Sequence, residues 1–261
     1  MNFGLIVIGD EILSGRRQDK HLPKVVELLS ARGHALAWAQ FIGDDRPRIV
    51  AALRDALDSG AVVFCCGGIG ATPDDHTRQC AAVASGRPLV LHPGAKALIE
   101  ERMRDVAAEK GEPFEPDRPD NLHRLNMGVF PDGASLIPNP YNKIPGFSVG
   151  RLHFVPGFPV MAHPMIEWVL DTAYADLVPT PHAERALYVY EAMEATLTPL
   201  MERIEAEHPG VRVFSLPSVD HPQRGRHIEL GVKGAPERVA PAFAALQAGL
   251  AAFSGVRVST E

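Results

Sequence analysis

Residues 67–77, Gly-Gly-Ile-Gly-Ala-Thr-Pro-Asp-Asp-His-Thr, form the stretch of this chain whose residue types best suit ligand chemistry. Gly67, Gly68 and Gly70 allow the backbone to adopt positive φ and to approach a ligand closely. An apolar run at 61–66 precedes this stretch and a helical pattern follows it. The stretch therefore predicts a strand-to-helix turn that directs N–H groups at an anion, usually phosphate.

Two carboxylates and no lysine lie in the same stretch. Asp74 and Asp75 beside a phosphate site indicate a bound Mg²⁺. They also suit a ligand with a paired N–H edge, such as a pterin or guanine ring. A purely structural alternative is that one of them caps the following helix. Because Thr72 and Thr77 lie nearby, we favour a ligand site over a plain turn.

Acidic residues also follow the two earlier strands of the predicted sheet. Ligands of open α/β sheets bind outside the carboxyl ends of the strands, so these acids should gather at one edge. Two structural alternatives stay open: the first pair can start a helix, and Asp44 can be a helix cap. The three pairs are Asp10/Glu11, Asp44/Asp45 and Asp74/Asp75.

The elements around these acids form a repeating pattern. Three short apolar runs, 3–8, 35–42 and 61–66, have the length of buried strands, and a helical pattern follows each of them. The order β-α-β-α-β-α predicts a parallel sheet with helices on both faces, since such crossovers are right-handed. We therefore predict an α/β fold with a three-layer, doubly wound, mostly parallel sheet.

The chain continues with a predicted helix at 93–110, an acidic and proline-rich surface loop at 111–121 and a helix at 161–175. Short strands at 134–137 and 152–155 lead into loops rich in proline and glycine. Because these loops follow strands, we expect them to line the same edge of the sheet.

The pattern changes near 178–181, a short proline-rich segment that we interpret as a linker. The following order of strand, helix, strand, strand and helix predicts a small α+β unit, βαββα. We therefore predict a ligand-binding domain over 1–177 and a smaller α+β domain over 183–261. The expected elements of the smaller domain are 186–191, 197–207, 211–216, 226–232 and 236–253.

Composition narrows the function classes. The 261 residues are 46% hydrophobic, which suits one large or two modest globular domains. A net charge of −6 without a basic stripe argues against nucleic acid as a partner. We find no membrane-length apolar run and no signal peptide. Cys65, Cys66 and Cys80 read as core residues of a reducing compartment, so we expect a cytoplasmic protein.

The loops together resemble the molybdopterin-binding domain family, whose fold is shared by MogA, MoaB and the amino-terminal domain of CinA. Residues 67–77 resemble the family pattern G-G-x-G-x-T-x-x-D-x-T, in its CinA-like variant with two adjacent Asp. Residues 9–15 resemble the CinA pattern G-x-E-x-L-x-G. Residues 130–146 resemble N-x-x-G-T-A-P-G with its lead-in, and residues 156–159 resemble P-G-x-P.

These four motifs occur in the family's order and cover residues 1 to about 175. The second domain is also similar to the small domain that follows in CinA-like proteins. The resemblance is to a subgroup without the carboxy-terminal amidohydrolase domain of CinA, because we expect no room for that domain in this chain.

The resemblance implies a small-molecule partner, either molybdopterin or an adenine nucleotide, together with Mg²⁺ or another divalent cation. Some CinA-like domains are similar to pyrophosphatases acting on ADP-ribose, and MogA-type members adenylylate molybdopterin. It implies Glu11, Asp44 and Asp75 as catalytic acids and metal ligands. The implied cofactor-binding residues are Gly9, Asp10, Gly67, Gly68, Ile69, Gly70, Thr72, Asp74, Thr77, Asn139, Lys143, Pro145, Gly146, Pro156, Gly157 and Pro159.

Three segments depart from the family patterns. Residues 142–144, Asn-Lys-Ile, replace Gly-Thr-Ala, which exchanges a hydroxyl for a lysine cation that would suit a phosphate. Met161 stands where CinA-like proteins have an acid, which weakens the case for metal-assisted hydrolysis. Lys20 and His21 replace a Thr-Asn pair.

Three hypotheses follow. The chain is a metal-dependent phosphoanhydride hydrolase or nucleotidyltransferase, a non-catalytic module that holds a pterin or nucleotide, or a scaffold that oligomerises through its second domain. Three acid-bearing loops at one edge favour the first two over a scaffold. Relatives self-associate, so we expect a homo-oligomer.

Overall fold

The computed structural model describes residues 1–179 and 181–259. The chain divides into two compact units, Met1–Val178 and Pro179–Glu261, and each is described by itself. Residue 180 of the expected linker lies outside the described residues.

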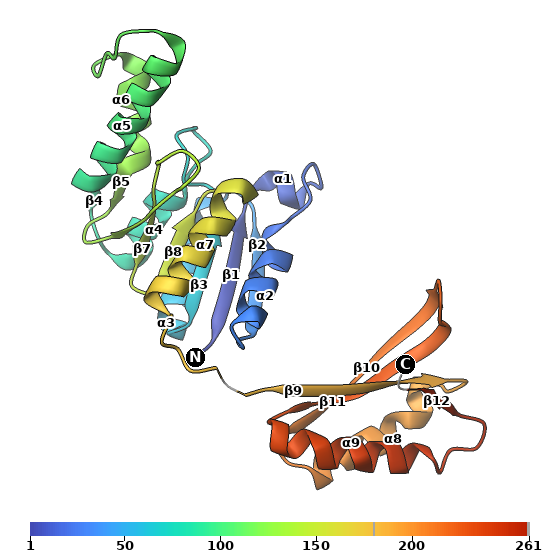
Figure 1. Cartoon of the computed structure of the whole chain (residues 1–261). Coiled ribbons are helices and arrows are strands. Elements are labelled where there is room, and N and C mark those ends of the chain that lie inside the picture. The colour runs from blue at the N-terminus through green and yellow to red at the C-terminus, as the bar shows by residue number, and fades with distance from the viewer. Residues whose placement is uncertain (180, 260–261) are drawn as a thin grey trace. The chain divides into compact units, whose positions relative to one another are not determined.

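A six-stranded sheet in the order β2-β1-β3-β8-β7-β6 forms the centre of the first unit (Figure 1). The first four of these strands are parallel, which confirms the predicted mostly parallel sheet. β7 runs antiparallel to both β8 and β6 and was not predicted from the sequence. The strands are β1 (Phe3–Ile8), β2 (Leu36–Ile42), β3 (Val62–Cys66), β6 (Ser135–Ile137), β7 (Gly146–Val149) and β8 (Leu152–Val155).

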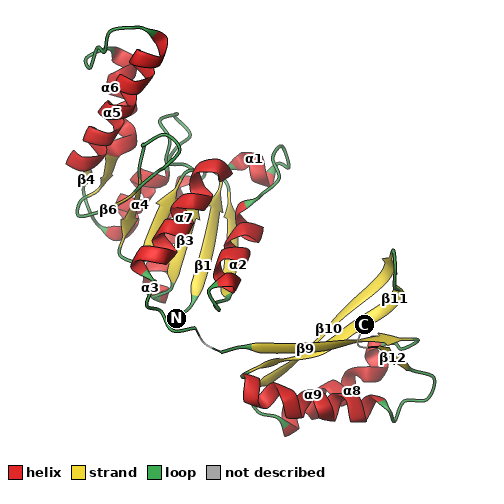
Figure 2. Cartoon of the chain, viewed as in Figure 1, coloured by secondary structure: helices red, strands yellow, loops and turns green. Residues whose placement is uncertain are grey.

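Helices cover both faces of this sheet, which confirms the three layers. α2 (His21–Ala31) and α7 (Pro159–Ala173) lie in front of it in Figure 2, over one hydrophobic core. α3 (Arg46–Ser59) and α4 (Thr77–Ser85) pack against each other over the second core. All residues of β1 and β3 are buried, as expected for strands covered on both sides.

A helical arm extends from a two-stranded ribbon of β4 (Leu89–Leu91) and β5 (Val129–Pro131). It contains α5 (Pro93–Lys110), which confirms the predicted helix, and then α6 (Pro119–Leu125) and the 3₁₀ turn η1 (Asn126–Gly128).

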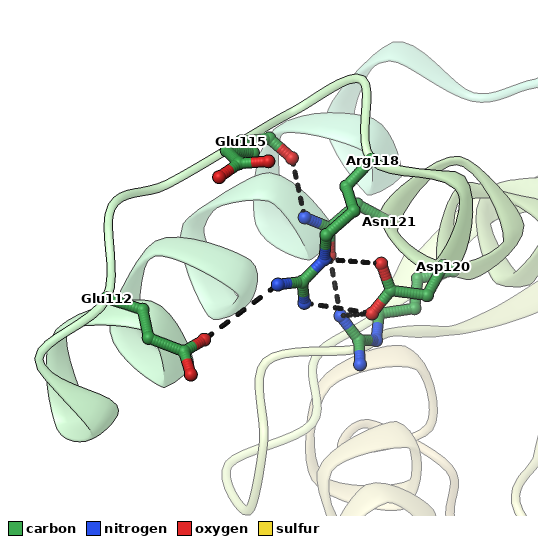
Figure 3. A network of polar contacts seen from close by, with 6 residues as sticks. Glu112, Glu115, Arg118, Asp120 and Asn121 are labelled. Atoms are coloured by element: carbon green, nitrogen blue, oxygen red, sulfur yellow. Dashed lines mark hydrogen bonds and ion pairs between the residues drawn. The ribbon is translucent and has the colours of Figure 1, made fainter.

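The connection between α5 and α6 is held by polar contacts. The Arg118 guanidinium donates to both carboxylate oxygens of Asp120, at 2.6 and 2.9 Å (Figure 3). The Asn121 side chain donates to the Glu115 carbonyl at 2.7 Å. The expected loop over 111–121 is therefore wrong in its last residues, because Pro119 occupies the first turn of α6.

The second unit is an antiparallel sheet in the order β10-β11-β9-β12 packed on two helices over its own core. This confirms the small α+β unit and adds one strand, β12, that was not predicted. β12 contains only three residues, too few for a periodic pattern. The elements are β9 (Ala183–Tyr190), α8 (Glu194–Glu207), β10 (Val211–His221), β11 (Gly225–Gly234), α9 (Pro236–Leu250) and β12 (Arg257–Ser259).

Among the described residues no helix combines the length and the apolar character that crossing a bilayer requires.

His153 should make the folding stability of the first unit depend on pH. Its ring is buried and hydrogen-bonds to the Ser148 hydroxyl and the Tyr174 hydroxyl, both at 2.8 Å. Burial lowers the pKa of His153 to about 4. The unfolded chain, with an ordinary histidine pKa near 6.5, therefore binds the proton more tightly than the folded protein.

The contribution of His153 to stability should be complete above pH 6.5. About 3 kcal/mol of it should be lost as the pH falls towards 4. Urea unfolding at pH 7 and pH 4.5 measures this loss. His153→Gln should flatten the pH dependence, and the same change at exposed His182 should not. Parallel pH profiles for wild type and His153→Gln would contradict the assignment.

Candidate functional site

A cavity of about 670 Å³ lies at the edge of the central sheet to which the motif loops belong. It brings together most of the residues that the sequence analysis selected. These are Gly9, Glu11, Asp44, Gly67, Gly68, Ile69, Gly70, Thr72, Asp74, Asp75, Asn139, Pro145, Pro156 and Gly157.

Four selected residues lie outside the cavity lining for local reasons. Asp10 begins the short helix α1 (Asp10–Leu13), and its side chain bonds to the Asp44 backbone. Thr77 is buried behind the glycine loop. Gly146 is the first residue of β7, and Pro159 is the first residue of α7.

Lys143 also lies outside the lining. Its ammonium group pairs with Glu101 at 2.6 Å and Asp105 at 2.7 Å, both on α5. These carboxylates raise the pKa of Lys143 through hydrogen bonds from its ammonium group. In this structure the lysine therefore ties the 139–145 loop to α5.

The glycine loop, which we define as the amide loop (residues 67–72), has its first carbonyls satisfied from inside the protein. The Thr77 hydroxyl donates to the Gly67 carbonyl at 3.0 Å, and the Thr77 N–H donates to the Gly68 carbonyl at 2.9 Å. Ile69 is buried in the core and anchors the loop.

Most N–H groups of the amide loop remain available to a ligand. The Gly67 N–H bonds to the Val155 carbonyl at 3.0 Å and continues the sheet. The N–H groups of residues 68–71 have no acceptor within the described residues, and all four residues line the cavity. Such a row of unpaired amides before the start of α4 suits an anion.

Asp75 closes the end of the amide loop. One of its carboxylate oxygens accepts from the Thr72 N–H at 2.9 Å and from the Thr72 hydroxyl at 2.5 Å. The N-cap of α4 is His76, whose side chain makes no capping bond. The alternative that an Asp of this loop caps the helix is therefore wrong. Asp75 holds the turn before it.

Asp10 and Asp44 form two reciprocal hydrogen bonds, each from the backbone N–H of one residue to the carboxylate of the other. The Asp10 N–H donates to the Asp44 carboxylate at 3.0 Å, and the Asp44 N–H donates to the Asp10 carboxylate at 3.1 Å. Asp45, the next residue, caps α3 by accepting from the Arg48 N–H at 2.9 Å. The capping role left open for Asp44 thus belongs to its neighbour.

Negative charge crowds around Asp44. Burial raises the pKa of its carboxyl group, and the neighbouring carboxylates of Asp10, Glu11 and Asp74 raise it further. We call these four residues the acidic cluster. No group of three or more potential metal ligands is arranged around a common point within the described residues. A divalent cation bound here would need oxygens from its ligand as well, which is how Mg²⁺ usually binds beside phosphates.

Several cavity residues were not selected from the sequence. Arg16 and Arg17 add positive charge, and the Arg17 guanidinium lies 5.7 Å from the centre of the Phe158 ring. Their position directly after the 9–15 motif is the signal that could have identified the two arginines. The remaining unselected lining residues are Ile8, Ala71, Met127, Asn142, Ile144, Phe158 and Met161.

Two departures from the family patterns contact each other in the cavity wall. The Asn142 side chain donates to the Met161 sulfur at 3.4 Å. Asn139 holds the same loop by donating to the Asn142 side chain at 2.8 Å and to the Ile144 carbonyl at 2.9 Å. A third departure, His21, hydrogen-bonds to the Gly157 carbonyl at 3.1 Å.

Comparison with known proteins gives consistent matches. The family model described as a probable molybdopterin binding domain matches residues 4–175. A CinA-like protein of Anaeromyxobacter dehalogenans (strain 2CP-C) is 31% identical over 220 residues, which cover 81% of this chain and 51% of that protein. The chain thus spans about half the length of this CinA-like relative.

Protein TV0584 of Thermoplasma volcanium is 28% identical over 217 residues, which cover 82% of this chain and 79% of that protein. The crystal structure of the protein CinA, of unknown function, from Thermoplasma acidophilum is 26% identical with a TM-score of 0.55. It covers 65% of this chain and 96% of that one.

Gly67→Ala should destabilise the protein far more than Gly60→Ala. Both glycines have positive φ, 108° and 65°. A Cβ at Gly60 meets open space, but one at Gly67 would lie 2.2 Å from the Ile8 carbonyl oxygen. We expect a loss of about 1 kcal/mol for Gly60→Ala and at least about 3 kcal/mol for Gly67→Ala in urea unfolding. Equal losses would show that the loop adapts to a side chain.

Asp44→Asn should stabilise the ligand-free protein at pH 7. Because its folded-state pKa is raised, ionisation of Asp44 costs folding stability above that pKa. We expect the melting temperature to rise by about 1–2 °C at pH 7 and by less as the pH falls, because a larger fraction of the carboxyl group is then protonated. Differential scanning calorimetry measures this, with exposed Asp117→Asn as control. A lower melting temperature at pH 7 would contradict the electrostatic account.

Proposed function

The chain belongs to the probable molybdopterin-binding domain family, and from this premise we propose that its cavity binds the phosphate of a pterin or a nucleotide. The observation that carries the proposal is the row of unpaired N–H groups at residues 68–71, which lines the same cavity as Glu11, Asp44 and Asp74.

The amide loop supplies the anion-binding half of the site. Four N–H groups that lack an acceptor in the described part of the chain, together with the start of α4, favour a phosphate group over a neutral one. The cavity volume of about 670 Å³ is within the range of pockets that enclose a whole cofactor or nucleotide. The apolar residues Ile144 and Phe158 provide contact area for a ring system.

The acidic cluster supplies the second half. Carboxylate oxygens are the ligands that Mg²⁺ prefers, so Glu11 and Asp44 would hold a divalent cation together with phosphate oxygens. Such a cation, when bound, would neutralise charge on a diphosphate. Asp75 would act mainly by holding the amide loop, since Thr72 occupies one of its oxygens.

For catalysis we propose metal-dependent hydrolysis of a phosphoanhydride. The amide loop would stabilise the charge that develops on the phosphate oxygens, and water would attack without a covalent intermediate. The second candidate is a binding module that holds its ligand without chemistry. The contact between Asn142 and Met161 favours the module, because it fills a place where relatives carry an acid.

One experiment separates the two candidates. The protein is incubated with ADP-ribose, FAD or ATP in the presence of Mg²⁺, Mn²⁺ or Co²⁺, and binding is followed by calorimetry in parallel. If the protein is an enzyme, products form, and their rate of formation falls at least about 100-fold in Asp44→Asn. This is the size expected for loss of an electrostatic catalytic group. If the protein is a binding module, it binds the compound saturably and no product forms.

Glu101→Gln is the matched control, because Glu101 pairs with Lys143 outside the cavity lining. It should change neither binding nor turnover by more than about twofold, as expected for an exposed ion pair. A wild-type protein that binds none of the three compounds and no pterin would remove the proposed function altogether.

A further inference from the structure

Arg78 is a buried arginine directly beneath the amide loop. It lies in the first turn of α4, and only 4% of its surface is exposed. Its guanidinium donates to the Gly70 carbonyl at 2.6 Å and to the Asn126 carbonyl. It therefore connects the amide loop with the turn that contributes Met127 to the cavity lining.

Among the residues that the structure describes, no carboxylate forms an ion pair with this guanidinium. Its third nitrogen, Nε, is buried and has no acceptor among the described residues. Asp75 interacts with Arg78 electrostatically, but the nearer bonds of that carboxylate go to Thr72. A buried cation that lacks an ion-pair partner is costly, and an anion bound above it would reduce that cost.

The amide loop also lacks a cation of its own. Residues 67–77 contain no lysine or arginine, and Lys143 is held by Glu101 and Asp105. Arg16 and Arg17 line the cavity from the loop after α1. Within the described part of the chain, Arg78 is thus the cation that hydrogen-bonds to the amide loop itself.

We propose that Arg78 supplies a buried positive charge behind the amide loop and that the loop therefore selects the dianionic form of a terminal phosphate. This rests on the proposed function, since it names the phosphate class that the same site takes. Arg78 does not line the cavity, so it is a positioning residue. It acts by orienting the Gly70 peptide and by placing positive charge behind the N–H groups.

Inorganic phosphate and sulfate, both in EDTA, are the probes. Phosphate changes from monoanion to dianion between pH 5.5 and 8, but sulfate is a dianion at both. The ratio of phosphate to sulfate affinity therefore corrects for titration of the protein. The charged and titratable groups at or beside the cavity lining include Asp10, Glu11, Arg16, Arg17, Asp44, Arg46, Asp74, Asp75 and His76.

In wild type we expect this ratio to rise about tenfold from pH 5.5 to 8, measured by NMR titration. In Arg78→Met, which removes the charge and keeps an unbranched side chain, phosphate should bind at least about tenfold more weakly at pH 8 and the rise should disappear. Arg78→Lys keeps the charge but loses the guanidinium that donates to two carbonyls, and should retain most of the rise in this ratio. If Arg78 had only a structural role, the lysine and methionine variants would bind phosphate equally weakly. Both would then keep the wild-type rise in the ratio of phosphate to sulfate affinity.

Failure of the two proposals would look different. If wild type binds neither anion, the proposed function fails. If wild type binds phosphate and Arg78→Met binds it with the same pH-dependent ratio, only the role of Arg78 fails. Should Arg78→Met not fold, wild type still tests the idea. The Nε–H signal of Arg78 should shift when phosphate binds at pH 8, and an unchanged signal would overturn the proposal.

Discussion

The hydrogen bonds of Thr77 decide which backbone groups the sheet edge can offer to a ligand. Its hydroxyl and its N–H bind the carbonyls of Gly67 and Gly68 from the protein interior. With these two carbonyls satisfied, the N–H groups of residues 68–71, which have no acceptor among the described residues, remain for a ligand. Thr77 is fully buried, so water does not compete for these bonds. A side chain at Gly68 would meet the Thr77 hydroxyl at 2.2 Å, which explains the glycine there.

The rim of the cavity is held by residues that replace the family patterns. Asn142 contacts Met161, and His21 holds the Gly157 carbonyl. Lys143 adopts a positive φ of 65°, unusual for a residue with a side chain, and is anchored to α5 by two carboxylates. Asn142, His21 and Lys143 thus each make a contact that fixes a loop at the rim of the cavity.

The sequence by itself determined the parallel sheet, the long helix of the arm and the positions of the acidic pairs. These features depend on local patterns. β1 and β3 read as continuous apolar runs because both faces are covered, and α5 is bounded by Pro93 and Gly111, which start and stop a helix. Acids at the ends of parallel strands must share an edge, so Glu11 and Asp44 could be placed near the glycine loop before any coordinates.

Only the tertiary structure decided where side chains point and which short segments pair. Lys143 points to α5 because it pairs with two carboxylates on that helix. These partners lie about forty residues earlier in the chain, so no local pattern encodes the contact. Asp45, and not Asp44, caps α3, a choice between neighbours that depends on the mutual bonds of Asp10 and Asp44. β7 and β12 are strands because partners lie beside them. The burial of Arg78 likewise follows from packing, since its sequence neighbourhood is polar.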